Sequence, residues 1–210
     1  MDKKLEKYLF EHSSPEDPVL EDLYRQTFIR FVNPNMVTGH IQGKLLEFIS
    51  VMIQPEFILE IGTFTGYSAI CLAKGLKPEG RLFTIEINDE LKEFSHSYFI
   101  KAGLGSSIIQ LNGRAQDIIP GIGKMFDLVY IDGDKREYTD YYNIVIRKMR
   151  PGGFIIADNV LWGNKVLEKS TRDRQTRGII EFNEMIRQQT NIEKVILPVR
   201  DGIMLIRKLI

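Results

Sequence analysis

Leu59-Glu60-Ile61-Gly62-Thr63-Phe64-Thr65-Gly66-Tyr67-Ser68 is the stretch that decides the fold of this chain. An apolar run over residues 57–61 meets a loop with two glycines, and a helical pattern over residues 68–74 follows at once. This order predicts a buried strand, a tight turn and a helix N-terminus. Proteins with alternating strands and helices use that arrangement to hold nucleotide-like ligands.

The glycine spacing indicates which ligand this loop suits. Dinucleotide binding requires G-x-G-x-x-G, and Phe64 stands where a second glycine would let the backbone approach a pyrophosphate. Glu60, at the strand end, would repel a phosphate but suits an amine-bearing ligand. The motif therefore favours S-adenosylmethionine, which carries an ammonium, a sulfonium and a ribose but no phosphate.

Composition excludes several other classes of protein. The chain has 210 residues, of which 43% are hydrophobic, so it can bury a sizeable core. Its 28 basic and 28 acidic residues cancel, so no global field draws it to nucleic acid or an anionic membrane. No apolar run approaches the ~20 residues of a membrane span, and the N-terminus lacks the apolar segment of a signal peptide. With the single Cys71, this favours a cytoplasmic protein that does not associate with membranes.

Periodicity predicts helices first and then alternating strands and helices. Helices are expected over 5–11, 18–31 and 39–53; strands over 57–61, 81–87, 107–111, 126–131 and 153–158; and further helices near 66–75, 89–102, 115–119, 138–149 and 174–189. Segments 194–198 and 202–208 flank a short connection and predict an antiparallel hairpin. We expect a single domain over residues 1–210, with an N-terminal helical cap (1–53) and a catalytic α/β core (54–210).

Acidic side chains follow the predicted strands where ligands bind in open sheets, at the carboxyl ends. Glu86 ends the second strand, where its carboxylate is placed to accept both ribose hydroxyls of a nucleoside. The alternative is a solvated helix cap ahead of residues 88–90.

Asp132 follows the fourth strand, and Asp158 and Asn159 follow the fifth. These strand ends are expected to be neighbours, so three oxygen ligands would share one cavity. Two carboxylates that converge repel each other unless a cation neutralises them. Ligation by oxygen alone suits Mg²⁺ or Ca²⁺ better than zinc. The alternative is that each aspartate caps the following helix.

Lys135 lies three residues after Asp132 and is placed to face the same cavity. Burial near a metal lowers the pKa of a lysine, which would let it act as a general base toward a hydroxyl. The alternative is a solvated surface lysine.

Several motifs together resemble the cation-dependent O-methyltransferases, a family that includes catechol and caffeoyl-CoA O-methyltransferases and small bacterial members. The resemblance runs from about Met36 to the end of the chain, and its motifs lie at residues 59–68, 84–87, 115–120, 131–135, 158–162 and 198–202. It implies a Rossmann-like, seven-stranded, mostly parallel α/β sheet with a C-terminal antiparallel hairpin and helices on both faces. It also implies S-adenosylmethionine-dependent, cation-assisted methylation of a catechol-like or vicinal-dihydroxy small molecule.

The same resemblance assigns roles to residues. The cofactor would contact Met36, Glu60, Gly62, Phe64, Ser68, Glu86, Ala115, Gln116 and Asp132. Asp132, Asp158 and Asn159 would hold Mg²⁺, or Ca²⁺ or Mn²⁺ in its place, and Lys135 would be the base, with Asp132 the second catalytic residue. Relatives are commonly homodimers, so a homodimer is expected.

This chain departs from the family pattern at two positions and in one segment. Gly133 replaces a histidine of the catechol enzyme, and Ala115 replaces a serine at the adenine end. Segment 163–177, with Lys165, Lys169, Arg172, Arg174 and Arg177, does not resemble the catechol enzyme's substrate loop. Its basic side chains would suit a hydroxylated uridine in transfer RNA as acceptor. The sequence is also compatible with a non-catalytic adenosyl-ligand-binding module and with an oxidoreductase that has a variant nucleotide loop.

Overall fold

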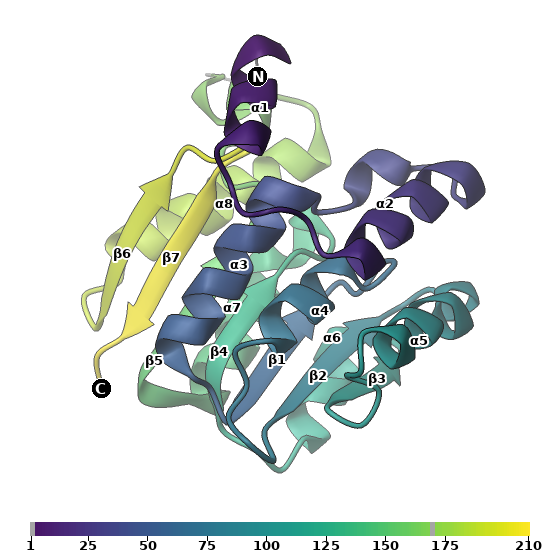
Figure 1. Ribbon diagram of the computed structural model, residues 1–210. Helices are drawn as coiled ribbons and strands as arrows, with labels where there is room; N and C mark the ends of the chain where they lie inside the picture. Colours follow the sequence, from purple (N-terminus) through teal and green to yellow (C-terminus); the bar gives the residue numbers. More distant parts are fainter. Residues whose placement is uncertain (1–2, 169–170) are drawn as a thin grey trace.

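A seven-stranded sheet forms the centre of the protein, and helices cover both of its faces (Figure 1). The computed structural model describes residues 3–168 and 171–210. The strands are β1 Phe57–Ile61, β2 Arg81–Glu86, β3 Ile108–Asn112, β4 Phe126–Ile131, β5 Met149–Ala157, β6 Ile192–Leu197 and β7 Ile203–Lys208, in the order β3-β2-β1-β4-β5-β7-β6. Strands β1 to β5 are parallel, and β7 runs antiparallel to both β5 and β6. The predicted mostly parallel sheet with a C-terminal antiparallel hairpin is confirmed.

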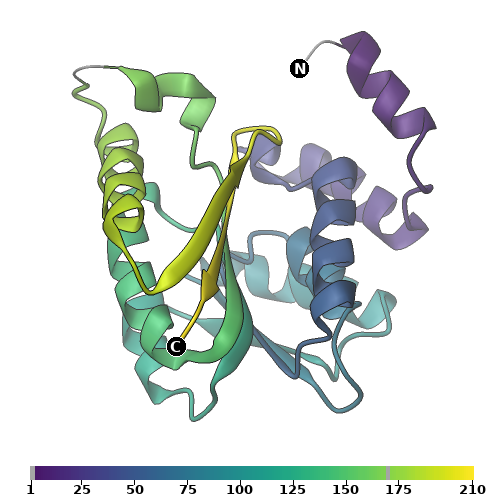
Figure 2. The same ribbon diagram turned by 90° about the vertical axis from the view of Figure 1, so that its left-hand side faces the viewer.

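The helices form one layer on each face of the sheet. They are α1 Lys3–Glu11, α2 Pro18–Arg30, α3 His40–Ile53, α4 Tyr67–Ala73, α5 Lys92–Lys101, α6 Ala115–Ile118, α7 Tyr138–Val145 and α8 Arg174–Gln188. Short 3₁₀ turns are η1 Pro34–Met36, η2 Asp89–Leu91, η3 Ile119–Gly121, η4 Lys135–Glu137, η5 Ile146–Lys148 and η6 Trp162–Leu167. In Figure 2, α7 and α8 lie on one side of the β6–β7 hairpin and α3 lies on the other.

The alternation of side chains along β4 divides the interior into two cores. Val129 and Ile131 belong to the core that contains residues of α6, α7 and α8, whereas Leu128 and Tyr130 belong to the core that contains residues of α2 to α5. Successive side chains of a strand point to opposite faces of the sheet. A central strand covered on both faces is therefore apolar throughout. The second core includes Leu46 of α3, so this helix packs into the core; the division at residue 53 stays a prediction.

The start of α2 is fixed by a cap and tied to α4. Asp17 accepts a hydrogen bond from the backbone N–H of Val19 at 2.9 Å, the usual role of an N-cap carboxylate. Its other oxygen pairs with Lys74, the residue that follows α4, at 3.0 Å. Tyr67 of α4 donates a hydrogen bond to Glu16. These contacts attach the N-terminal helices to the sheet.

Strand β5 begins at Met149 and not at residue 153 as the sequence pattern predicted. Pro151-Gly152-Gly153 has the composition of a turn, but here it lies inside the strand where the β4–β5 register shifts. Arg150 holds this end of the strand by binding Asp127 at 2.9 Å and Glu56 at 3.1 Å.

Candidate active site

The loop after β1 touches the loop after β4, and this contact requires a glycine. Gly62 has φ +101°, and a Cβ built on it would lie 2.4 Å from the carbonyl oxygen of Asp132. The N–H of Asp132 in turn donates to Ile61 at 2.9 Å. Only glycine permits both the backbone angle and this close approach. The glycine loop and Asp132 are thus brought together.

A small cleft beside this contact gathers five of the predicted cofactor residues, namely Met36, Gly62, Phe64, Ser68 and Asp132. Its volume is about 10 Å³, close to that of one water molecule. Binding sites for drug-sized ligands have about 300–1,000 Å³. This cleft alone is therefore smaller than the space that a ligand of the size of S-adenosylmethionine fills.

The two glutamates predicted for the cofactor lie behind and beside the glycine loop. Glu86 accepts a hydrogen bond from the N–H of Phe64 at 2.8 Å. It also accepts one from the N–H of Asn88 at 3.0 Å, but the N-cap of η2 is Asn88 and not Glu86. Glu60 is fully buried; its Oε2 accepts from Thr84, and its Oε1 has no partner among the described residues. Burial raises the pKa of Glu60 to about 8.

Ala115 and Gln116 begin α6 at the same edge of the sheet. The N–H of Gly113 donates to the carbonyl of Glu86 at 2.9 Å, which brings the segment before α6 to the end of β2. The amide of Gln116 donates to Glu137 at 2.7 Å. All nine predicted cofactor residues thus lie in the glycine cleft or in the strand-end segments around it; their role as contacts stays a prediction.

Gly133, one of the two departures from the family pattern, is explained by a neighbouring ring. A Cβ at Gly133 would lie 2.9 Å from the ring of Tyr141 and 3.2 Å from Ile61. Tyr141 donates its hydroxyl to Glu137 at 2.8 Å. A histidine does not fit at this position while Tyr141 keeps its place.

Lys135 is buried, with 7% of its surface exposed, so the interpretation as a solvated lysine is wrong. Its Nζ donates to Oδ1 of Asp132 at 2.6 Å and to the hydroxyl of Tyr138 at 3.0 Å. Tyr138 in turn donates to the backbone carbonyl of Asp158 at 2.9 Å. One hydrogen-bonded chain therefore joins the ends of β4 and β5.

Helix α8 holds the backbone of Lys135 in place, which sequence reasoning missed. Gln175 accepts a hydrogen bond from the N–H of Lys135 at 3.1 Å. A Cβ at Gly178 would lie 2.3 Å from the carbonyl oxygen of Lys135. The signal in the sequence was a glycine inside a helix, which often marks a close packing contact.

Neither Asp132 nor Asp158 is a helix cap, so that interpretation is wrong. The N-cap of η4 is Asp134 and the N-cap of η6 is Leu161. Asp158 is 3% exposed, and its carboxylate accepts from the N–H of Asn159 at 2.7 Å and from the hydroxyl of Tyr130 at 2.6 Å.

The strand ends that carry Asp132 and Asp158 are neighbours, since β4 pairs with β5 from Leu128 to Ile131. Burial raises the pKa of Asp132 to about 6; Lys135 opposes this shift, and the charge of Asp158 adds to it. Asn159 has φ +57°, which is uncommon for a residue other than glycine and occurs at functional sites.

The donor set fits a hard divalent cation. No three histidine, cysteine, aspartate or glutamate side chains gather around a metal position in residues 3–168 and 171–210. The candidate set combines two carboxylates and one amide, all oxygen ligands of the kind that Mg²⁺ accepts. The charges of Asp132 and Asp158 repel each other, and Lys135 and Arg200 are the cations that oppose this effect at Asp132.

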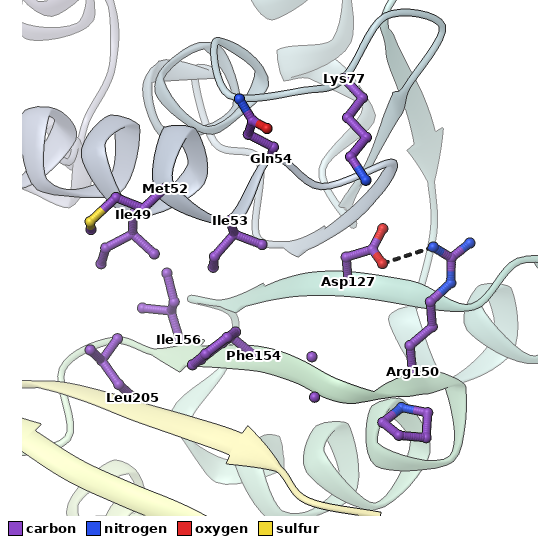
Figure 3. A pocket seen from close by; sticks show the side chains of 13 residues that line it. Ile49, Met52, Ile53, Gln54, Lys77, Asp127, Arg150, Phe154, Ile156 and Leu205 are labelled. Atoms are coloured by element: carbon purple, nitrogen blue, oxygen red, sulfur yellow. Dashed lines mark hydrogen bonds and ion pairs between the residues drawn. The ribbon is translucent and has the colours of Figure 1, made fainter.

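A larger cavity lies elsewhere. It has about 580 Å³ and is lined by residues from the end of α3, from β4 and β5 and from β7, among them Met52, Phe154 and Leu205 (Figure 3). The Asp127–Arg150 ion pair closes its polar end. None of the predicted site residues lines it.

A mostly parallel sheet with a terminal antiparallel hairpin, a glycine loop and acidic strand ends defines the class of Rossmann-like methyltransferases. The sequence pattern of the O-methyltransferase family matches residues 10–209, and this chain belongs to that family. The family predicted from the motifs is confirmed, and the protein is therefore classed as an enzyme.

Individual relatives agree with this assignment. A catechol O-methyltransferase from Niastella koreensis is 37% identical over 171 residues, 79% of this chain and 74% of that protein. A caffeoyl-CoA O-methyltransferase from Petroselinum crispum is 30% identical over 98% of this chain and 90% of its own. The crystal structure of the O-methyltransferase TomG from Streptomyces achromogenes, in complex with S-adenosylmethionine, superposes with a TM-score of 0.92 at 31% identity, covering 100% of this chain and 99% of that one.

Proposed function

We propose that this protein transfers the methyl group of S-adenosylmethionine to a hydroxyl of a catechol-like or vicinal-dihydroxy small molecule, assisted by Mg²⁺. The observation that carries the proposal is the hydrogen-bonded group of Lys135, Asp132 and Asp158 at the ends of β4 and β5, beside the glycine loop. The catechol and caffeoyl-CoA enzymes among the relatives support the class of acceptor.

The cofactor would be held by charge and hydrogen bonds, not by phosphate contacts. Glu60 offers a buried carboxylate to the ammonium group, and Glu86 offers its remaining lone pairs to the ribose hydroxyls. Met36 and Phe64 flank the same cleft. These contacts orient the methyl group toward the carboxyl end of β4.

Asp132, Asp158 and Asn159 would hold the divalent cation. When bound, such a cation lowers the pKa of a coordinated hydroxyl and fixes its orientation for attack. By holding the cation, these three residues would fix the position of the acceptor hydroxyl relative to Lys135 and to the glycine cleft.

Lys135 takes the proton. Its Nζ donates to Asp132 and to Tyr138, and these two hydrogen bonds fix the direction of the side chain. As the acceptor oxygen bonds to the methyl carbon, the carbon–sulfur bond of the sulfonium breaks and the hydroxyl proton moves to Nζ. S-adenosylhomocysteine and the methyl ether leave the site.

Removal of the metal tests this proposal. We expect excess EDTA to abolish methylation of a catechol panel by labelled S-adenosylmethionine, and Mg²⁺ to restore it, because the cation prepares the hydroxyl for attack. Calorimetric titration with S-adenosylhomocysteine is the control, and its affinity should largely survive chelation. Full activity in EDTA would remove the metal from the mechanism.

A transfer RNA acceptor is the second candidate, and one observation favours it. Lys165, Arg172, Arg174 and Arg177 are exposed and form no ion pair within the described residues, whereas Lys169 lies outside them. Zero net charge favours a small acceptor instead. A gel shift with transfer RNA decides between the two, since binding through phosphates weakens steeply with salt.

A homodimer and a cytoplasmic location complete the proposal. Cys71 is buried and unpaired, as expected of a protein from a reducing compartment. In residues 3–168 and 171–210, no helix has the length and apolar character needed to cross a bilayer.

A further inference from the structure

Asp158 has one carboxylate oxygen that is already fully used. Oδ2 accepts from the hydroxyl of Tyr130 at 2.6 Å and from the side-chain amide of Gln42. A carboxylate oxygen has two lone pairs in its plane, so these two donors occupy both. Oδ1 accepts only the N–H of Asn159, at 2.7 Å, and keeps one lone pair for another ligand.

The orientation of the Gln42 amide is fixed by Arg200. Gln42 lies on α3 and is 2% exposed, so water does not compete for its amide. Its Oε1 accepts from Nη1 of Arg200 at 3.3 Å. Because a guanidinium only donates, the carbonyl end must face Arg200 and the NH₂ end must face Asp158.

Arg200 itself is anchored on two sides. Its Nη1 donates to the carbonyl of Val37 at 3.2 Å and to that of Thr38, next to the glycine cleft. It lies in the β6–β7 turn, where Asp201 accepts from the N–H of Leu161 at 2.7 Å. One turn thus holds both the Gln42 amide and the loop that carries Asp158 and Asn159.

We propose that Gln42 is a positioning residue that, together with Tyr130, makes Asp158 a one-oxygen metal ligand and so favours Mg²⁺ over Ca²⁺. The inference rests on the proposed function, since it assumes a cation between Asp132 and Asp158. Ca²⁺ takes six to eight oxygen ligands and commonly uses both oxygens of a carboxylate, whereas Mg²⁺ needs an octahedral set at shorter distances. Blocking Oδ2 removes a ligand that Ca²⁺ would use.

Direct metal binding tests this role without relying on activity. The probe is Mn²⁺, whose free fraction is measured by electron paramagnetic resonance, with Mg²⁺ and Ca²⁺ as competitors and S-adenosylhomocysteine present. The variants are Gln42→Leu and Tyr130→Phe, each of which frees one lone pair of Oδ2. Gln110→Leu is the matched control, because the Gln110 amide donates to Ser95 near the opposite edge of the sheet.

We expect the ratio of Mg²⁺ to Ca²⁺ affinity to fall by about tenfold in each site variant, the lower end of the 10–100-fold effect of removing a group that orients a metal ligand. The ratio in Gln110→Leu should match the wild type. An unchanged ratio in a folded Gln42→Leu or Tyr130→Phe variant would overturn the inference alone. If the wild-type protein bound no Mn²⁺, or if Asp158→Ala did not remove the bound Mn²⁺, the proposed metal site would fail as well.

Discussion

At the scale of single residues, burial separates two of the proposed functional side chains from water. Lys135 is 7% exposed and Glu60 is fully buried. Lys135 already donates to Asp132, whereas Oε1 of Glu60 has no hydrogen-bond partner in the described chain. Burial disfavours the charged form of Glu60, and a bound ammonium group would favour it.

Replacing Lys135 by methionine should abolish methyl transfer but leave cofactor binding intact. General base catalysis contributes about 10²–10⁴-fold, so we expect kcat to fall by that factor, with the affinity for S-adenosylhomocysteine within about threefold of wild type. Single-turnover kinetics and calorimetry measure the two quantities. Lys148→Met is the control, because Lys148 only donates to the carbonyls of Pro120 and Ile122. Wild-type turnover in Lys135→Met would end the assignment of the base.

Cofactor affinity should depend on pH through Glu60. Its pKa in the free protein is raised to about 8, so below pH 8 the side chain is mostly protonated and must lose its proton to bind an ammonium group. Affinity should therefore rise by up to about tenfold per pH unit between pH 6.5 and 8, above the pKa of about 6 of Asp132, and then level off. Calorimetry in buffers of different ionisation enthalpy should detect the released proton.

The Glu60→Gln variant gives the corresponding control, since it cannot release a proton and its affinity should vary little over the same pH range. The same raised pKa has a consequence for folding. Protonated Glu60 favours the folded state most at pH values below its unfolded pKa of 4.5, and this contribution is lost as the pH rises through about 8. A wild-type affinity that is flat from pH 6.5 to 8 would show that Glu60 does not face the ligand.

At the scale of elements, the glycine loop and the β4 loop form one unit. Gly62→Ala would place a methyl group 2.4 Å from the carbonyl of Asp132 at a φ of +101°. We expect a loss of about 1–3 kcal/mol in the free energy of unfolding, and weaker cofactor binding, because the two loops must separate. Gly103→Ala is the matched control: its φ is +71°, and its Cβ would meet nothing within 4 Å. If denaturant melts gave both variants an equal loss in the free energy of unfolding, backbone strain alone would explain it, and contact between the two loops would play no part.

The sequence predicted those elements whose signal is local. Strand β1 and the glycine loop were placed correctly because an apolar run, two glycines and a helical pattern follow each other directly between residues 57 and 74. The start of β5 was missed because Pro151-Gly152-Gly153 resembles a turn, and only pairing with β4 makes it a strand. Local composition cannot reveal a partner strand.

The residues of the candidate site show the same difference between local signals, which the sequence discloses, and long-range contacts, which it does not. Asp132 and Asp158 were identified because they follow strands, and parallel strands end at one edge. The role of Lys135 as the base was assigned by the family resemblance. Gln42 and Arg200 gave no such signal. Gln42 meets Asp158 across 116 residues of sequence and Arg200 across 158. Contacts of that separation depend on how the layers pack, so a single sequence without an aligned set of relatives does not disclose them.

At the scale of the whole molecule, one face of the sheet is apolar and incompletely covered. The cavity of about 580 Å³ beside α3 is lined by Met52, which is 73% exposed, and by Leu205 of β7 (Figure 3). Val195 of β6, opposite Leu205 in the register and so on the same face, is 51% exposed. Exposed apolar surface of this kind marks protein–protein interfaces, and the family resemblance makes a second copy of the chain the expected partner.

Sedimentation velocity tests whether this face joins two subunits. We expect wild-type protein to sediment as a dimer of the 24.3 kDa chain, and both Met52→Lys and Val195→Lys to shift it toward the monomer, because a buried lysine without a partner opposes association. Ile100→Lys is the matched control: Ile100 is 60% exposed on α5, the helix that packs beside the β3 edge, and its replacement should leave the dimer intact. A dimer that survives both substitutions would move the interface to another surface. A wild-type monomer at micromolar concentration would instead mean that the exposed apolar face does not mediate self-association.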